Sequence, residues 1–89
     1  MTATDPNTVP AATAQAVLAY LTRQLVDDPD AVSVDVEDGN GRTVLNVRVA
    51  PGDMGRVIGK RGRVANSIRT IVRAAAVRDG VEVDVEFVD

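Results

Sequence analysis

The spacing of apolar residues changes several times along this chain, and each change predicts a different element. Between residues 9 and 28 the apolar residues recur at steps of three and four, which is typical of an amphipathic helix; they are Ala14, Val17, Leu18, Leu21 and Leu25. Thr8 is the predicted N-cap, Pro10 fits the first turn, and Pro29 ends the helix.

Two alternating stretches follow and predict a β-hairpin. Val32, Val34 and Val36 alternate with small or charged residues, which is the period of a half-buried strand. The next stretch places four residues on one face, namely Thr43, Leu45, Val47 and Val49. Residues 38–41 are a turn signal. A four-residue turn puts Glu37 opposite Arg42 and stacks three inner pairs, Val36 with Thr43, Val34 with Leu45 and Val32 with Val47.

The rest of the chain predicts two helices and a third strand. Asp53 is the predicted cap of a short helix that contains Met54, Val57 and Ile58. A longer helix begins after residue 62 and ends near Asp79 and Gly80; its predicted apolar face consists of Val64, Ile68, Ile71, Val72 and Ala75. Residues 81–88 form the last strand, whose inward positions are Val81, Val83, Val85 and Phe87.

The predicted order is therefore helix, strand, strand, helix, helix, strand. Three strands with one apolar face, covered by helices on that face, make a two-layer α+β domain. We expect a flexible tail over residues 1–8 and a single domain over residues 9–89.

The residues that are missing exclude several classes of function. The chain has no cysteine and no histidine, so it cannot form a disulfide, a zinc site or a histidine-based catalytic triad. We expect no enzymatic activity, no metal and no cofactor. The sequence shows neither a membrane-spanning apolar run nor a signal peptide, which favours a cytoplasmic protein without membrane contact.

Charge is distributed unevenly along the chain. The net charge is −3, yet seven of the ten cations lie between residues 54 and 78, a stretch without a single acid. All 13 acids lie elsewhere. The basic stretch therefore predicts a local anion site on an acidic body.

Gly59-Lys60-Arg61-Gly62 lies at the centre of this basic stretch, between the two predicted helices. The first amides of the second helix lack intrahelical partners, and the helix dipole adds positive charge there. The glycines allow a sharp turn and a close approach by phosphate, while Lys60 and Arg61 supply mobile cations. The alternative is an ordinary helical corner with solvated charges.

Other motifs fit less well. Gly55 and Gly59 are too close for a phosphate-binding P-loop, and no Ser or Thr follows Lys60 to bind magnesium. The first glycine pair of a dinucleotide-binding fingerprint is missing. The alternating acids Glu82, Asp84 and Glu86 are interpreted as a solvated outer face of the sheet rather than a metal or catalytic site.

Residues 57–63, Val-Ile-Gly-Lys-Arg-Gly-Arg between two helices, resemble the signature of KH domains. The order of elements is similar to the type II KH arrangement found in bacteria. Residues 49–60 and 69–76 further resemble the small stand-alone bacterial KH proteins of the KhpA (YlqC) family, and the resemblance covers about residues 18–88.

The resemblance implies that the loop clamps the backbone of single-stranded RNA with low sequence specificity. The residues that it places at the RNA are Gly59, Lys60, Arg61, Gly62, Arg56, Ile58, Arg63, Asn66 and Arg69. Val57 and Ile68 are expected beside the bases. For Asn66, Arg69 and Arg73, an extended backbone track and a solvated helix surface are both open interpretations.

The resemblance also implies an RNA chaperone that forms a homodimer, or a heterodimer with a KhpB-type (Jag or EloR) KH protein. Such a pair is linked to cell elongation and envelope homeostasis. Exposed helix residues such as Tyr20 are candidates for dimer contacts. A second hypothesis is a protein-interaction module whose partner carries most of the RNA binding, and the acidic net charge favours it.

Overall fold

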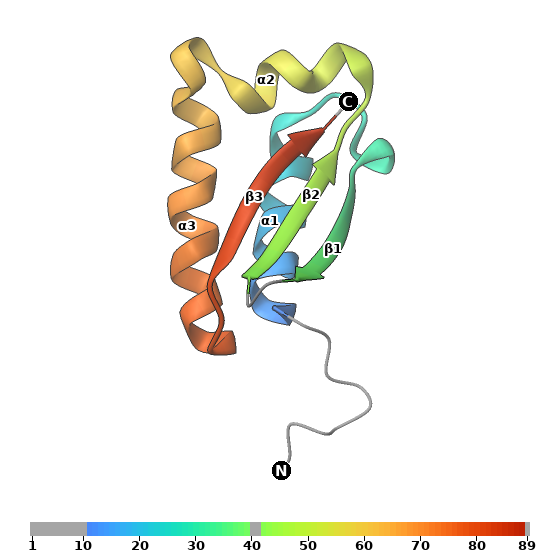
Figure 1. Cartoon of the computed structure of the whole chain (residues 1–89). Helices are drawn as coiled ribbons and strands as arrows, with labels where there is room; N and C mark the ends of the chain where they lie inside the picture. The colour runs from blue at the N-terminus through green and yellow to red at the C-terminus, as the bar shows by residue number, and fades with distance from the viewer. Residues whose placement is uncertain (1–10, 40–41, 89) are drawn as a thin grey trace.

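The computed structural model describes residues 11–39 and 42–88. The elements are α1 (Ala12–Leu25), β1 (Ser33–Gly39), β2 (Arg42–Arg48), α2 (Met54–Ile58), α3 (Arg63–Asp79) and β3 (Val83–Val88), shown in Figure 1. Short 3-10 turns precede β1, α2 and α3, at Pro29–Ala31, Pro51–Asp53 and Lys60–Gly62. The tail predicted over residues 1–8 and the N-cap predicted at Thr8 lie outside the described residues.

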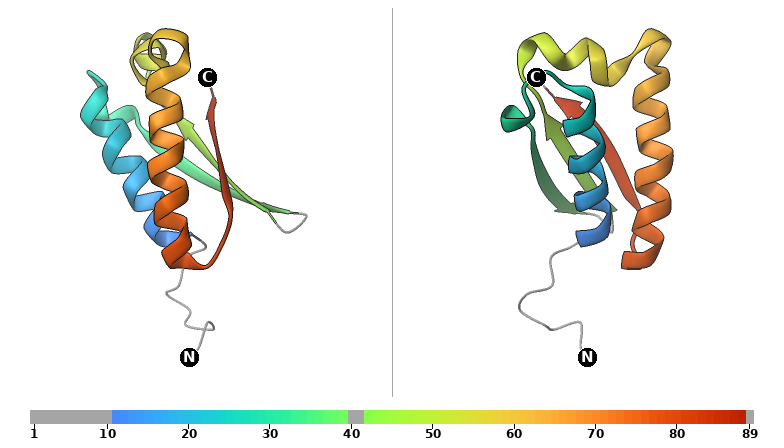
Figure 2. Two further views of the ribbon diagram at one scale, coloured as in Figure 1. Left: turned by 90° about the vertical axis from the view of Figure 1, so that its left-hand side faces the viewer. Right: turned by 180° about the vertical axis from the view of Figure 1, so that it is seen from behind.

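The predicted element order and the α+β class are confirmed. The sheet has the order β1-β2-β3, with β1 and β2 antiparallel and β2 and β3 parallel. Figure 2 shows α1 and α3 on the same side of the sheet, while α2 crosses one end of the molecule. A parallel pair requires a long crossover connection, and α2 and α3 provide it.

The hairpin register predicted from the sequence is wrong by two residues. Val36 pairs with Leu45 and Val34 with Val47, and the ladder extends to Gly39 opposite Arg42. Only two residues, 40 and 41, separate these last partners. Because side chains alternate with a period of two, a shift of two residues keeps the same side chains on the inner face.

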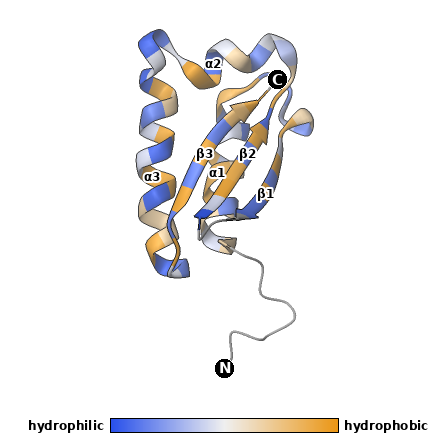
Figure 3. Ribbon diagram, viewed as in Figure 1, coloured by the Kyte–Doolittle hydropathy of each residue, from blue (hydrophilic) through white to orange (hydrophobic). Residues whose placement is uncertain are grey.

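The core lies between the sheet and the two long helices. Among the described residues, six large apolar side chains are almost completely buried, and they are Leu18, Leu45, Val47, Val57, Val72 and Val85. Figure 3 shows the alternation of apolar and polar residues along the strands that places one apolar face toward the helices. The predicted face of α3 is only partly correct, because Ile71 is 48% exposed whereas Ala65 and Ala76 are buried.

Helix α1 is shorter than predicted at its C-terminal end. It ends at Leu25, and Val26 is already extended, so Pro29 does not terminate it. Asp53 holds the chain that follows, because its carboxylate accepts hydrogen bonds from the backbone amides of Asp27 (3.2 Å) and Asp28 (3.1 Å). This buried carboxylate does not cap α2 through its side chain, contrary to the prediction.

Candidate functional site

The predicted loop forms the corner between α2 and α3 (Figure 1). Three of its four residues have a positive φ, with 74° at Gly59, 57° at Arg61 and 73° at Gly62. Left-handed backbone is unfavourable for a residue with a side chain, so Arg61 carries local strain of about 1 kcal/mol. Such a conformation turns the chain within four residues and starts α3 directly at Arg63.

The two glycines of this loop have different physical roles. A Cβ atom on Gly59 would collide with Val64 Cγ2 and lie 2.8 Å from Val64 Cβ, so the loop packs against the first turn of α3 in a way that only glycine permits. A Cβ atom on Gly62 would have no heavy atom within 4 Å. Gly59 therefore closes the corner, whereas Gly62 leaves open space at the start of α3.

The start of α3 is a local centre of positive charge. Gly62 occupies the N-cap position, and no side chain in the described part of the chain caps this end. The amide of Arg63 donates to the backbone oxygen of Lys60, so the amides that follow it in the first turn, together with the positive end of the helix dipole, are what this end offers to solvent or to an anion. A surface hollow beside them is lined by Lys60, Arg61 and Arg63. None of these three cations forms an ion pair within residues 11–39 and 42–88.

Arg56 lies near the loop but its charge is already paired. Its Nη2 is 3.0 Å from Asp27 Oδ2, and its Nε is 3.5 Å from Asp53 Oδ1. These contacts connect α2 to the segment that follows α1. The structure therefore places Arg56 in an ion-pair cluster, apart from the unpaired cations of the loop.

Asn66 and Arg69 lie on the side of α3 that faces β3. The Arg69 Nε donates a hydrogen bond to the backbone oxygen of Val85 (3.1 Å), and its Nη1 donates to Asn66 Oδ1 (3.1 Å). Gly62, Asn66 and Arg69 are spaced by four and three residues, so they share one face of the helix. Asn66 and Arg69 therefore form a polar row along α3 that begins at the loop.

The aliphatic residues expected beside the bases are mostly inaccessible. Val57 is fully buried and Ile68 is 3% exposed, and both belong to the core. Ile58 is partly buried and packs against the core from the end of α2. Of the three, only Ile58 keeps a surface that a ligand could contact next to the loop.

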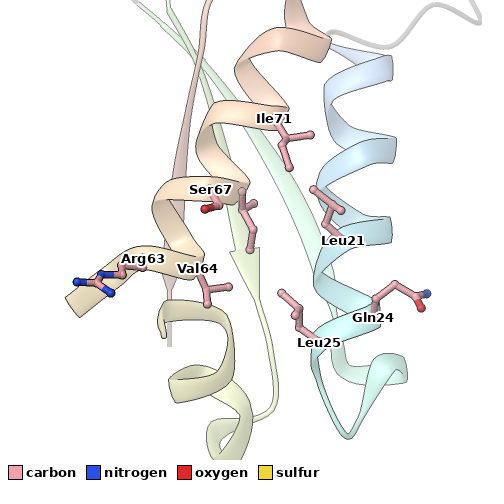
Figure 4. A pocket seen from close by; sticks show the side chains of 8 residues that line it. Leu21, Gln24, Leu25, Arg63, Val64, Ser67 and Ile71 are labelled. Carbon is pink, nitrogen blue, oxygen red and sulfur yellow. The ribbon is translucent and has the colours of Figure 1, made fainter. Parts of the chain in front are cut away.

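An apolar hollow of about 320 Å³ lies between α1 and α3 (Figure 4). Leu21 and Leu25 line it from α1, and Val64 and Ile71 line it from α3. Sequence periodicity assigned Ile71 to the core and therefore missed this surface. The signal that could have revealed it is the excess of apolar residues on α3, which occupy more of the helix than one contact face can bury.

One acidic residue of β3, Asp84, is used in ion pairs. Asp84 lies 2.9 Å from Arg42 Nη2 and 3.7 Å from Arg73 Nη2. No group of three or more carboxylates among the described residues could hold a metal ion. Arg73 is thereby connected to the sheet rather than left as an unpaired cation on α3.

Comparison with known sequences places these features in a family. The family described as KhpA/KhpB, KH domain, matches residues 15–87. A protein named RNA-binding protein KhpA from Clostridium acetobutylicum is 46% identical over 72 residues, which cover 81% of this chain and 96% of that protein. Proteins with the same name from Caldanaerobacter subterraneus subsp. tengcongensis (47% identity, 76% and 91% coverage) and Leifsonia xyli subsp. xyli (46%, 81% and 92%) are also similar.

Solved structures with a similar fold include the protein Era. A crystal structure of an Aquifex aeolicus Era variant superimposes with a TM-score of 0.63 at 17% identity, covering 90% of this chain and 30% of Era. A structure of Era in complex with a segment of 16S ribosomal RNA gives a TM-score of 0.65, again at 17% identity, with coverage of 91% and 31%. This likeness concerns the fold, and this chain spans less than a third of Era.

Proposed function

This chain belongs to the KhpA/KhpB family of KH domains, and from that premise we propose that it binds single-stranded RNA with low sequence specificity. Gly59, Lys60, Arg61, Gly62 and Arg63 grip the sugar-phosphate backbone. Ile58 contacts the ribose or base beside the loop, and Asn66 and Arg69 continue the site along α3. The relatives are named as RNA-binding proteins rather than as enzymes, in line with the expectation of a binding protein.

The observation that carries this proposal is the loop at the start of α3. Three unpaired cations surround a helix end that no described side chain caps. The open space at Gly62 allows a phosphate group to reach the amides without a steric barrier. Arg56 is the weakest member of the predicted set, because the carboxylates of Asp27 and Asp53 offset its charge.

Low sequence specificity is proposed because the chain lacks stacking platforms. It contains one Tyr and one Phe, whereas single-strand binders that use stacking rely on several exposed aromatic rings. Phosphate contacts fix the position of the strand but carry no sequence information. Most of the affinity is therefore expected to be electrostatic.

The test is the double variant Lys60→Asp and Arg61→Asp, with binding of a fluorescent single-stranded RNA measured by anisotropy. The matched control is Arg23→Asp with Arg78→Asp, which changes the net charge equally at two exposed positions. We expect the loop variant to lose at least tenfold in affinity and the control to lose much less. Equal affinities of the loop variant and the wild type, with native circular dichroism, would refute the site assignment.

We further propose that the chain acts as a cytoplasmic RNA chaperone in a complex with a KhpB-type KH protein, in a role linked to cell elongation and envelope homeostasis. Residues 9–89 act as one domain in this proposal. The apolar hollow between α1 and α3 supports the partner contact, because Ile71 is 48% and Leu25 is 37% exposed there. No helix within the described residues is long and apolar enough to cross a membrane.

The partner proposal is tested with Ile71→Glu. Co-purification with the KhpB-type protein from the same organism should be lost, while RNA binding of the isolated chain is kept. Val77→Glu is the matched control, since Val77 is 76% exposed on the same helix and does not line the hollow. A homodimer instead of a heterodimer would appear in light scattering of the chain alone, as a doubled mass that Ile71→Glu removes.

A second candidate function is a protein-interaction module whose partner binds most of the RNA. The net charge of −3 and the apolar hollow favour it. Crosslinking of RNA to this chain, with and without the partner, separates the two functions. A crosslink on the isolated chain supports direct binding, whereas a crosslink that requires the partner supports the interaction module.

A further inference from the structure

The guanidinium group of Arg69 is held in a fixed position between α3 and β3. Strand β3 has a neighbour on one side only, so some of its backbone groups face away from the sheet. The backbone oxygen of Val85 is one of them, and Arg69 Nε donates a hydrogen bond to it at 3.1 Å. Asn66 Oδ1 accepts from Nη1 at 3.1 Å, and the Cζ atom lies 5.4 Å from the centre of the Phe87 ring.

These three contacts use only part of the hydrogen-bonding capacity of Arg69. A guanidinium group has five N–H donors in one plane. Nε and one N–H of Nη1 are occupied, so the other N–H of Nη1 and both N–H groups of Nη2 have no partner within the described residues. Arg69 is half-buried, and its contacts hold the guanidinium plane in place. The remaining N–H groups of Nη1 and Nη2 therefore form a fork of donors whose orientation is set before any ligand binds.

The guanidinium group of Arg69 lies on the face of α3 that continues from the loop. Arg69 follows Gly62 by seven residues on the same face of α3, which is a distance of about 10 Å along the helix axis. Lys60 and Arg61 are exposed loop cations that suit phosphate groups of any sequence. Arg69 differs from them because it is immobilised beside an aromatic ring and faces the space between a helix and an edge strand.

We propose that Arg69 contacts an unpaired base, not a phosphate, and that it favours guanine. This inference rests on the proposed RNA binding through the loop and adds a specificity-determining residue to it. Guanine presents two adjacent acceptors, O6 and N7, which match a guanidinium fork and form the commonest specific contact between arginine and a base. Among the other unpaired bases only cytosine, through O2 and N3, offers two adjacent acceptors. A single contact of this kind adds a modest preference for guanine to RNA binding that is otherwise non-specific.

The experiment compares short oligouridylates that contain one guanosine with the all-uridine strand, using the full chain. We expect the guanosine strand to bind about fivefold tighter or more. Replacing guanosine by 7-deazaguanosine, which lacks the N7 acceptor, should remove most of this preference from the unchanged protein. Arg69→Lys, which keeps the charge but loses the fork, should bind both strands equally, with the salt dependence of the wild type.

Lys60→Ala provides the contrasting variant. A lost phosphate contact weakens binding to all strands alike and reduces the slope of log affinity against log salt by about 1, while the guanine preference is kept. A guanine preference that survives both 7-deazaguanosine and Arg69→Lys would overturn the assignment. So would an Arg69→Gln variant that behaves like Lys60→Ala, with an equal loss of affinity for both strands and a slope reduced by about 1, because Arg69 would then contact phosphate. If the wild type binds neither strand, the proposed RNA binding itself fails.

Discussion

The carboxylate of Asp79, at the C-terminal end of α3, accepts a hydrogen bond from the backbone amide of Ala14 in the first turn of α1 (3.0 Å). Its other oxygen accepts from the amide of Thr13 at 3.1 Å. Two amides that α1 cannot satisfy internally are thus capped by a residue more than 60 positions away. The contact fixes one end of α1 against α3.

This cap makes stability depend on pH. Burial acts to raise the pKa of Asp79, but the hydrogen bonds from Ala14 and Thr13 and the charge of Arg78 outweigh it, so the pKa lies below its usual value. A carboxyl group whose pKa is lowered on folding stabilises the protein above the pKa of the unfolded chain, about 4, and loses this effect as the pH falls through the folded value.

We therefore expect Asp79→Ala to lower the free energy of unfolding by about 1 kcal/mol at pH 7. The difference from the wild type should shrink below about pH 4, as the wild-type carboxylate becomes protonated. Urea denaturation followed by circular dichroism at several pH values measures both effects. Asp30→Ala, at an exposed acid, is the control and should change stability little. A difference that is constant down to pH 2 would show that the charge of Asp79 does not matter.

Gly59→Ala should destabilise the protein more than Gly62→Ala. Both positions have a positive φ, which costs a residue with a side chain about 1 kcal/mol. Only at Gly59 does the added Cβ also collide with Val64. Thermal denaturation of the two variants separates the collision from the backbone effect. The double variant with Gly59→Ala and Val64→Ala should recover part of the loss, beyond the sum of the single changes.

Asp53→Ala should cost about 2 kcal/mol, because it leaves the amides of Asp27 and Asp28 without their acceptor in a partly buried corner. Removing its ionic partner with Arg56→Gln should cost less than about 1 kcal/mol, since that side chain is 54% exposed. Urea denaturation compares the two directly. Equal losses would indicate that the ion pair, and not the backbone hydrogen bonds, holds this corner.

The affinity for RNA should fall steeply with salt. If about four phosphates are neutralised, log affinity decreases with log salt with a slope near −3 for a single strand. Anisotropy titrations at several salt concentrations give the slope. Arg56→Gln should leave it nearly unchanged, because this cation is already paired with Asp27 and Asp53. A slope close to zero for the wild type would contradict binding through phosphate contacts.

The sequence by itself determined the secondary elements, their order and the position of the loop. Apolar periods of two and of three to four residues reflect which faces of each element are buried, and this information is local. The same is true of Gly59-Lys60-Arg61-Gly62, whose residue types favour a turn and an anion site wherever the chain places them. For this reason the inner and outer faces of the hairpin strands were predicted correctly, although the predicted register was wrong by two residues.

Only the tertiary structure decided how these elements meet. The partners of Asp53 and Asp79, the pairing of Arg56 and the exposure of Ile71 all depend on contacts between segments distant in the chain. Local periodicity cannot distinguish an apolar residue that is covered from one that is left open, because covering depends on the neighbouring helix. The fixed position of Arg69 is likewise a property of α3 and β3 together, since each supplies only one side of the contact.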